Sequence, residues 1–258
     1  MASTDARRLA ILEALRDSKT IRVADLSRQF GVSEVSIRRD LAKLEQYGLL
    51  RRVHGGAIGN PTVPPNHSFD ERLRRRAEEK RRIGKAAAAL VQPGDSIILD
   101  SGTTVLQVAR EIAARSEQPE QFTVITSSLP AFRELAGSRN LSLIILGGVF
   151  LPDYQTLVGP QTLANLSALH ADKLFLGSDG LSFSHGVTTR SLLEAEVSKA
   201  MVRAATEIIV VCDSKKIGTV GFTSVVPLSQ VHRLVTDTEA PEPFVNELRS
   251  VGVEVILA

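Results

Sequence analysis

Apolar side chains in the first 60 residues recur at helical spacing and predict three short helices. The opening segment carries four of them within roughly three turns, namely Leu9, Ile11, Leu12 and Leu15. A second helix is expected over 23–30, with Gly31 at its end. A third is expected from an N-cap at Ser33 to about Tyr47, and its inward face consists of Ile37, Leu41 and Leu44.

The pattern changes to short strands directly after the third helix. Two strands are expected near 49–53 and 57–58, with Gly55 and Gly56 forming the turn between them. Three helices followed by a hairpin are typical of a winged helix-turn-helix domain. We therefore expect this domain over residues 1–58, with the helix-turn-helix at about 20–39.

Residues 60–66 contain three prolines and predict a linker, because proline lacks the amide that helices and sheets need. Residues 69–91 then have a helical pattern that is dense in charge at first and rich in alanine afterwards. We expect one linker helix here that transmits motion between two domains. The predicted division is 1–58 for the first domain, 59–82 for the linker and 83–258 for the second domain.

Short apolar runs alternate with helical stretches through the rest of the chain and predict an α/β fold. Seven strands are expected, near 97–99, 122–125, 141–146, 173–176, 207–212, 233–235 and 253–257. Because helices separate most of these runs, the sheet is expected to be mostly parallel and covered on both faces. The loops after its strands then meet at one rim, where such folds bind ligands.

Composition adds a strong asymmetry of charge to this picture. The net charge is +2 overall, but residues 1–82 carry +7 and residues 83–258 carry −5. This division suits a front end that binds polyanions. The single cysteine, Cys212, excludes an internal disulfide and is expected to be a small buried hydrophobe. Without a long apolar span or a secretory signal pattern, we expect a cytoplasmic protein that does not enter membranes.

The third helix and the hairpin carry the residue types that contact DNA. Arginine can donate two parallel hydrogen bonds to guanine or clamp a phosphate, and hydroxyls near a helix N-terminus suit phosphate oxygens. The candidate DNA-binding residues are Ser33, Ser36, Arg38, Arg39, Lys43, Arg51, Arg52 and His54. The alternative is an ordinary solvated helix face, which tandem arginines alone would favour. Asp40 is expected to be structural and to pair with an arginine.

These segments resemble the DeoR (GlpR-type) family of bacterial transcriptional regulators over nearly the whole chain. The resemblance rests on Arg7, Ile11, Leu15, Ser33, the segment Ser36-Ile37-Arg38-Arg39-Asp40-Leu41 and the segment Arg52-Val53-His54-Gly55-Gly56-Ala57. Ser36 stands where the family usually has threonine. We expect this difference to alter base preference slightly and to leave binding intact.

Small and polar residues follow four of the predicted strands in the second domain. Glycines let the backbone approach a ligand, and hydroxyls with free helix amides suit a phosphate. These loops are Asp100-Ser101-Gly102-Thr103-Thr104, Thr126-Ser127-Ser128, Gly147-Gly148 and Gly177-Ser178-Asp179-Gly180. The first loop alone could be only a capped helix. Four such loops at corresponding strand ends favour one binding rim for anions and hydroxyls.

Charged residues near this rim leave two interpretations open. Glu194 could accept hydrogen bonds from sugar hydroxyls, and Lys216 and Arg190 could contact a phosphate or be surface charges. Glu196 and Lys199 look like an exposed helical pair.

The resemblance implies that the second domain is a sensor similar in fold to ribose-5-phosphate isomerase, with a phosphorylated sugar or polyol as effector. It implies effector contacts from Asp100, Gly102, Thr103, Thr104, Thr126, Ser127, Asp179, Glu194 and Lys216. With the neighbouring loop residues, the candidate effector site also includes Ser101, Ser128, Gly147, Gly148, Gly177 and Gly180. Lys80 matches a recurrent lysine of the family.

A working phosphosugar isomerase is the main rival interpretation of the second domain. The similar isomerase has an Asp-Gly-Ala-Asp motif followed by a glycine loop that bears a lysine. Here Leu176-Gly177-Ser178-Asp179 and His185-Gly186-Val187 stand in those places, so the first aspartate and the lysine are missing. This favours a sensor with no catalytic residues. A nonspecific DNA-coating protein, the third possibility, would leave the rim without a purpose.

We therefore expect a sequence-specific regulator that represses a carbohydrate utilisation operon until a sugar or polyol phosphate binds. Its expected partners are double-stranded operator DNA and that effector, with no cofactor and no metal. A single winged helix offers little specific surface, so a homodimer or homotetramer is expected.

Overall fold

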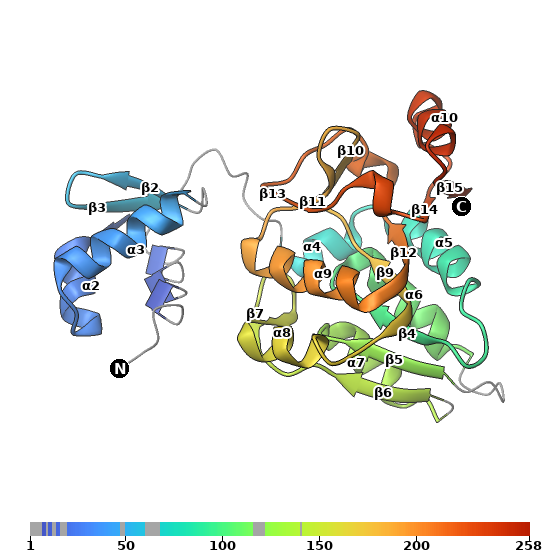
Figure 1. The fold of residues 1–258 in the computed structure, drawn as a ribbon, viewed down its shortest axis with the longest axis horizontal. Helices are drawn as coiled ribbons and strands as arrows, with labels where there is room; N and C mark the ends of the chain where they lie inside the picture. Colours follow the sequence, from blue (N-terminus) through green and yellow to red (C-terminus); the bar gives the residue numbers. More distant parts are fainter. Residues whose placement is uncertain are drawn as a thin grey trace. The chain divides into compact units, whose positions relative to one another are not determined.

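The computed structural model describes residues 7, 8, 10, 11, 14, 15, 20–46, 50–59, 68–115, 122–139 and 141–258. The chain divides into two compact units, Met1–Asn66 and His67–Ala258. Each unit has its own hydrophobic core, and Figure 1 shows the helices and strands of each unit. The linker expected at 60–66 lies outside the described residues.

The first unit contains the expected helices. Residues 7, 8, 10, 11, 14 and 15 are helical, and α2 (Val23–Phe30) and α3 (Glu34–Gln46) follow. Gly31 ends α2 in the left-handed conformation with φ 63°, as its position predicted. The core of the unit is formed by apolar side chains from all of these segments, among them Ile11, Leu26, Ile37, Leu41 and Leu44.

A three-stranded antiparallel sheet completes the first unit. It consists of β1 (Thr20–Arg22), β2 (Leu50–Val53) and β3 (Gly56–Gly59) in the order β1-β3-β2. The hairpin β2-β3 was expected, whereas β1 was not, because three residues are too short to show a strand pattern. A Cβ atom on Gly56 would lie 2.0 Å from the carbonyl oxygen of Ile21, so only glycine lets β3 lie this close to β1.

The helix expected over 69–91 is two helices in the structure, α4 (Phe69–Arg74) and α5 (Ala77–Ala88). The break occurs at Arg76, whose φ of 50° is left-handed. Its guanidinium binds Glu239, Asp237 and Glu79 at 3.0–3.2 Å. Both helices belong to the second unit, and α5 buries Ile83, Ala87 and Ala88 in its core. The expectation of one continuous linker helix was therefore wrong.

The centre of the second unit is a seven-stranded sheet in which every pair of neighbouring strands is parallel. Its order is β15-β14-β12-β9-β4-β5-β6. The strands are β4 (Ser96–Leu99), β5 (Phe122–Thr126), β6 (Leu141–Ile145), β9 (Ala171–Leu176), β12 (Ala205–Val211), β14 (Arg233–Thr236) and β15 (Glu254–Leu257). All seven strands predicted from the apolar runs are confirmed within a few residues.

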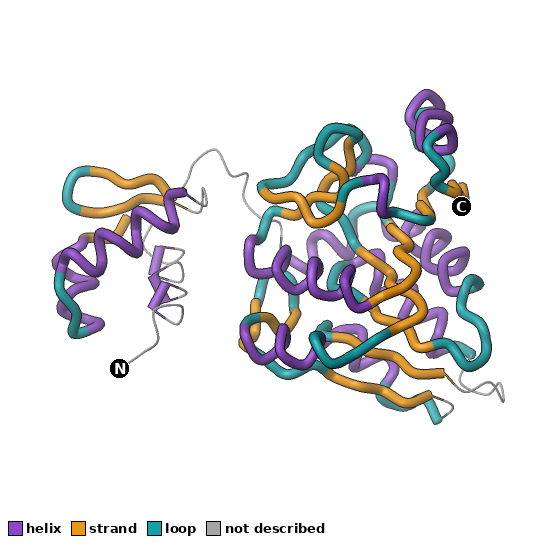
Figure 2. Tube along the Cα trace, viewed as in Figure 1, coloured by secondary structure: helices purple, strands orange, loops and turns teal. Residues whose placement is uncertain are grey.

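Helices cover both faces of this sheet (Figure 2). One face packs against α5, α6 (Thr103–Ala113) and α7 (Leu129–Leu135). The other packs against α8 (Pro160–Leu166), α9 (Leu192–Ala204) and α10 (Glu242–Ser250). Successive strand residues such as Ile97 and Ile98 enter opposite cores, which explains why these strands are apolar throughout.

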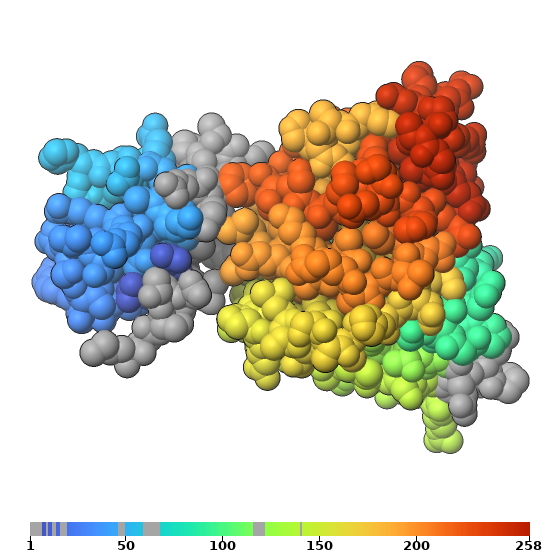
Figure 3. Space-filling view, viewed as in Figure 1, coloured from blue at the N-terminus to red at the C-terminus, as the bar shows by residue number. Residues whose placement is uncertain are grey.

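Short antiparallel strands that the sequence did not reveal lie beyond the ends of the parallel strands. They are β7 (Val149–Leu151), β8 (Thr156–Val158), β10 (Gly180–Ser182), β11 (Gly186–Thr189) and β13 (Thr223–Val226). The atoms of the β10-β11 turn lie beside those of α10 (Figure 3), where the ring centroids of Phe183 and Phe244 are 4.7 Å apart.

Within the described ranges, no helix has the length and apolar character needed to cross a membrane. The same ranges hold no group of three or more histidine, cysteine, aspartate or glutamate side chains placed to bind a metal ion. Cys212 is buried at the end of β12, as expected.

Candidate DNA-binding face and effector site

The third helix of the first unit, α3, presents its basic residues outward. Ile37, Leu41 and Leu44 are at most 3% exposed and face the core. Arg38 and Arg39 are exposed, and Ser36 and Lys43 are partly buried. Arg38 pairs with Glu34 one turn earlier at 2.8 Å, a surface pair of little energetic weight that can open when another anion arrives.

The N-terminus of α3 is capped as its sequence predicted. The Ser33 hydroxyl accepts a hydrogen bond from the amide of Ser36 at 3.3 Å, and the two serine hydroxyls lie 3.0 Å apart. Both hydroxyls therefore lie at the positive end of the helix, where a DNA phosphate would be bound most favourably.

Asp40 fixes α3 to the first helix. Its carboxylate is almost fully buried and accepts hydrogen bonds from Arg7 Nε at 2.7 Å and Arg8 Nε at 2.9 Å. The expected structural role is confirmed, and its partners come from the preceding helix rather than from α3 itself.

The wing packs beside α3 through Arg52. Its backbone amide and Nε both donate to Glu45 of α3, at 2.8 and 2.6 Å, and these hydrogen bonds lower the pKa of Glu45. Arg51 and His54 are exposed. A hollow of about 560 Å³ lies between α3 and the wing, lined by Val23, Arg38, Leu41, Arg52, Val53, His54, Gly55 and Gly56.

In the second unit, the loop after β4 places Asp100 against the loop after β9. Asp100 is 4% exposed and accepts hydrogen bonds from the Gly177 amide at 3.2 Å and from Ser198 Oγ of α9 at 3.3 Å. Burial raises its pKa to about 6, and the nearby charge of Asp179 adds to this effect. A Cβ atom on Gly177 would lie 2.8 Å from the carbonyl oxygen of Ser101, so glycine is needed for this approach.

Glu194 is a second buried carboxyl beside Asp100. It accepts a hydrogen bond from Ser101 Oγ at 2.6 Å and lies in hydrogen-bond contact with Thr189 Oγ1. Burial, followed by the charges of Asp179 and Asp100, raises its pKa well above the usual range for glutamate. Both carboxyls therefore hold a proton more tightly than exposed carboxyls do, and their oxygens accept hydrogen bonds from serine hydroxyls.

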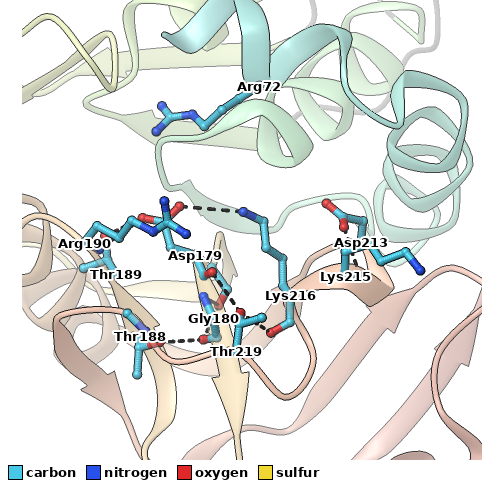
Figure 4. A network of polar contacts seen from close by, with 12 residues as sticks. Arg72, Asp179, Gly180, Thr188, Thr189, Arg190, Asp213, Lys215, Lys216 and Thr219 are labelled. Carbon is cyan, nitrogen blue, oxygen red and sulfur yellow. Dashed lines mark hydrogen bonds and ion pairs between the residues drawn. The ribbon is translucent and has the colours of Figure 1, made fainter. Parts of the chain in front are cut away.

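Asp179 is the third carboxyl of the site, and Figure 4 shows its side chain facing Lys216. Its Oδ2 accepts from Tyr154 OH, Thr189 Oγ1 and the Arg190 amide, each at 3.1 Å. Its Oδ1 lies 3.9 Å from Lys216 Nζ. Lys216 belongs to the short 3-10 helix Ser214–Lys216 after β12, whose N-cap is Asp213.

Arg72 of α4 approaches the same place from the other side (Figure 4). Its guanidinium lies 4.6 Å above the ring of Tyr154, and Nη2 donates to the carbonyl of Asp153 at 2.7 Å. Nη1 is buried and has no hydrogen-bond partner among the described residues. A buried guanidinium nitrogen without a protein acceptor is costly, and Arg76 Nε, Ser214 Oγ and Thr236 Oγ1 are likewise buried without a partner among the described residues.

Lys80 supports Arg72 rather than facing the site directly. It is 4% exposed, and its ammonium donates to the carbonyls of Arg72 and Arg75 at the end of α4. The pKa of Lys80 is lowered to about 8, mainly by burial. The negative charge of Asp213 raises this pKa, whereas the positive charges of Lys216 and Arg72 lower it. Several cations are therefore held close together at this site.

The hydroxyls of the loop after β5 are used within the protein. Thr126 Oγ1 donates to the carbonyl of Leu99 at 2.8 Å, Ser127 Oγ lies 3.0 Å from Thr156 Oγ1, and Ser128 caps α7. The proposed effector contacts of these three residues stay predictions, and their observed role is to hold the rim together.

Gly147 and Gly148 lie against α8 and β8. The Gly147 carbonyl accepts a hydrogen bond from Thr162 Oγ1 at 2.7 Å. A Cβ atom on Gly148 would lie 2.2 Å from Thr162 Oγ1. No contact between the described residues connects them to Asp100.

The hydroxyls of Thr103 and Thr104 form no hydrogen bond within the described residues. These two residues follow Gly102, which precedes α6 with φ 110°. Both residues are 8% exposed.

Sequence reasoning thus placed Asp100, Asp179, Glu194 and Lys216 on one rim, and the structure brings them together. The prediction from sequence did not include Arg72, Tyr154, Thr189 and Ser198, which lie outside the loops predicted to form the rim. Gly180 lies next to Asp179, where a Cβ atom would lie 2.5 Å from the Thr219 carbonyl, so its role is close packing.

Two family models match the chain. The model of the DeoR-like helix-turn-helix domain matches residues 7–63, and that of the DeoR C terminal sensor domain matches residues 75–238. The first match spans the candidate DNA-binding residues and the second spans Asp100, Asp179, Glu194 and Lys216, whereas Arg72 lies between the two matched ranges.

Curated relatives match along nearly the whole chain. A putative aga operon transcriptional repressor of Escherichia coli O157:H7 is 34% identical over 100% of this chain and 95% of its own length. The HTH-type transcriptional repressor GlcR of Bacillus subtilis is 33% identical, covering 98% and 96%. A lactose phosphotransferase system repressor of Streptococcus mutans is 37% identical, covering 89% and 90%.

Among solved structures, ribose 5-phosphate isomerase A of Methanocaldococcus jannaschii is similar over 55% of this chain and 54% of that chain. The TM-score is 0.41 and the sequence identity is 22%.

Proposed function

Because the chain belongs to the DeoR family of helix-turn-helix transcriptional regulators, we propose that it represses a carbohydrate utilisation operon and that a phosphorylated sugar or polyol controls its binding to operator DNA. The observation that carries the effector assignment is the site on the second unit. There, buried carboxyls lie next to a group of cations that includes the unsatisfied nitrogen of Arg72.

The two halves of this site suit the two halves of such an effector. The carboxyl oxygens of Asp100, Glu194 and Asp179 can accept hydrogen bonds from sugar hydroxyls. They already accept hydrogen bonds from serine and threonine hydroxyls of the protein. Arg72 and Lys216, with Thr103 and Thr104 at the N-terminus of α6, offer donors to a phosphate. Because the hydroxyl and phosphate groups lie on one molecule, both halves act together only on a phosphorylated compound.

We further propose that the second unit is a sensor and that it catalyses no isomerisation. Sugar isomerisation needs a positioned base and donors that stabilise an enediolate-like intermediate. The segment His185-Gly186-Val187, which stands where the similar isomerase has a glycine loop that bears a lysine, holds no lysine here. Serine and threonine hydroxyls hold the buried carboxyls in fixed positions, which suits the binding of a sugar phosphate.

Operator recognition is proposed to need two or four copies of the chain. One α3 and one wing cover a short stretch of DNA, and helix-turn-helix proteins gain specificity from paired half-sites. Control then requires that the effector bind one state of the protein more tightly than the other.

The effector site is tested by ligand binding to the full chain. We expect a panel of sugar and polyol phosphates to contain a compound that binds the wild-type protein and that raises its melting temperature, whereas the dephosphorylated parent does not. The variant Lys216→Ala removes one charge from the phosphate side, and loss of one charge-assisted hydrogen bond costs about 1.5–3 kcal/mol. Its affinity is therefore expected to fall by roughly tenfold or more.

The matched control is Lys215→Ala, because Lys215 is the adjacent lysine and its side chain is 70% exposed. It should bind the effector as the wild type does. Equal effects of the two substitutions, or equal binding of phosphorylated and dephosphorylated compounds, would contradict the assignment of the phosphate side.

A further inference from the structure

Val35 is a large apolar side chain exposed on the surface of α3. It is 66% exposed, more than any other large apolar side chain that the structure describes as exposed. A solitary exposed valine is common on protein surfaces and by itself indicates nothing. Its position on α3 is what distinguishes this one.

Val35 lies at the centre of the outward face of α3. An α-helix turns by about 100° per residue, so Val35 and Arg39 lie on one side and Ile37 and Leu41 on the opposite side. The exposures agree, since Ile37 and Leu41 are buried whereas Val35 and Arg39 are exposed. Val35 is also the second residue of α3, and the N-terminal residues of a recognition helix contact base edges.

Valine is a poor choice for this position if stability alone matters. Its β-branched side chain lowers helix propensity relative to alanine or lysine, and here it buries no apolar surface in return. Arg39, one turn further along, has no hydrogen bond or ion pair with other described residues, unlike Arg38, which pairs with Glu34. Among the described residues, the outward face therefore carries an apolar group without packing partners beside a cation without an ion-pair partner.

We propose that Val35 reads thymine by packing its methyl groups against the C5-methyl group of that base in the major groove. Among the four bases, only thymine offers an apolar group in that groove, and small apolar side chains contact it. Arg39 would lie on the neighbouring phosphate or base edge. This inference rests on the proposed DNA-binding function and adds one base preference to it.

Replacing thymine by deoxyuridine removes this methyl group and leaves every hydrogen-bonding atom in place. The full chain is first used to enrich binding duplexes from a random pool, and each thymine of an enriched duplex is then replaced in turn. Burial of one methyl group corresponds to about a fourfold change in affinity. At one thymine of each half-site, we expect deoxyuridine to weaken wild-type binding by that factor and to weaken the binding of Val35→Ala by less, because the shorter alanine side chain packs less surface against the methyl group.

The fold of the variant is not at risk, because alanine is the better helix former at an exposed position. Val251→Ala is the matched control, since Val251 is 58% exposed in the other unit, and it should keep the wild-type sensitivity to deoxyuridine. Equal effects of deoxyuridine on the wild type and Val35→Ala at every position would overturn the role of Val35 while operator binding stands. Failure to enrich any duplex would instead overturn the proposed DNA-binding function itself.

Discussion

At the scale of single residues, the burial of Asp100 connects the effector site to stability. Its folded-state pKa of about 6 lies above the ordinary 3.8, so the folded state binds this proton more tightly than the unfolded chain. The contribution to stability is therefore present at low pH and is lost as the pH rises through about 6. The buried carboxyl of Glu194 acts in the same direction.

We expect Asp100→Asn to reduce this pH dependence, because an amide does not titrate. Between pH 5 and pH 7.5 the wild-type free energy of unfolding should fall by on the order of 1 kcal/mol more than that of the variant. Urea unfolding of the full chain at the two pH values measures the difference. Asp70→Asn, at an exposed aspartate of α4, is the control and should behave as the wild type. Identical pH profiles of Asp100→Asn and wild type would show that the carboxyl does not titrate as described.

The residues of the rim differ in how far the sequence revealed them. Asp100, Asp179 and Lys216 follow strands that are recognisable from their apolar runs, and parallel strands must end at one edge. Arg72 was hidden because it lies in a segment dense in charge, where each arginine resembles a solvated surface residue. Only the folded chain shows that its guanidinium lies over the ring of Tyr154 and that its Nη1 is buried.

At the scale of elements, strands that cross the core were predictable and short strands at its edge were not. The seven parallel strands are buried on both faces, so their sequences are apolar throughout. By contrast, β10 and β11 contain three and four residues, and β11 pairs with β13, which lies far away in the sequence. The break at Arg76 was missed for the same reason, because Asp237 and Glu239, which hold it, come from the end of β14.

The close approach of β1 and β3 gives a prediction for the wing. In Gly56→Ala the new Cβ atom meets the Ile21 carbonyl, so the strands must separate. We expect the first unit to lose about 1–3 kcal/mol of stability and operator affinity to fall with it. Hydrogen exchange of the amides of α3 and β3 in the full chain measures the loss of stability. Gly137→Ala has open space around its new Cβ atom and should change neither quantity. Unchanged exchange in Gly56→Ala would show that the wing does not depend on this contact.

At the scale of the whole molecule, the two units carry different charges and different chemistry. The front of the chain is basic and presents α3 and the wing, whereas the second unit is acidic overall and holds Lys80, Lys216 and Arg72 near one another at the rim. A regulator needs this separation, because DNA and a phosphorylated effector are both anions and would otherwise compete for one basic surface. Their binding is then coupled through the states of the protein rather than through a shared site.

The affinity of the full chain for its enriched operator duplex, measured at fixed salt with and without each member of a panel of sugar and polyol phosphates, tests this account most directly. We predict that at least one phosphorylated compound weakens operator binding by a factor within about 5–150, the usual range of allosteric coupling, and that its dephosphorylated parent does not. Operator affinity unchanged by every phosphorylated sugar and polyol would contradict the account.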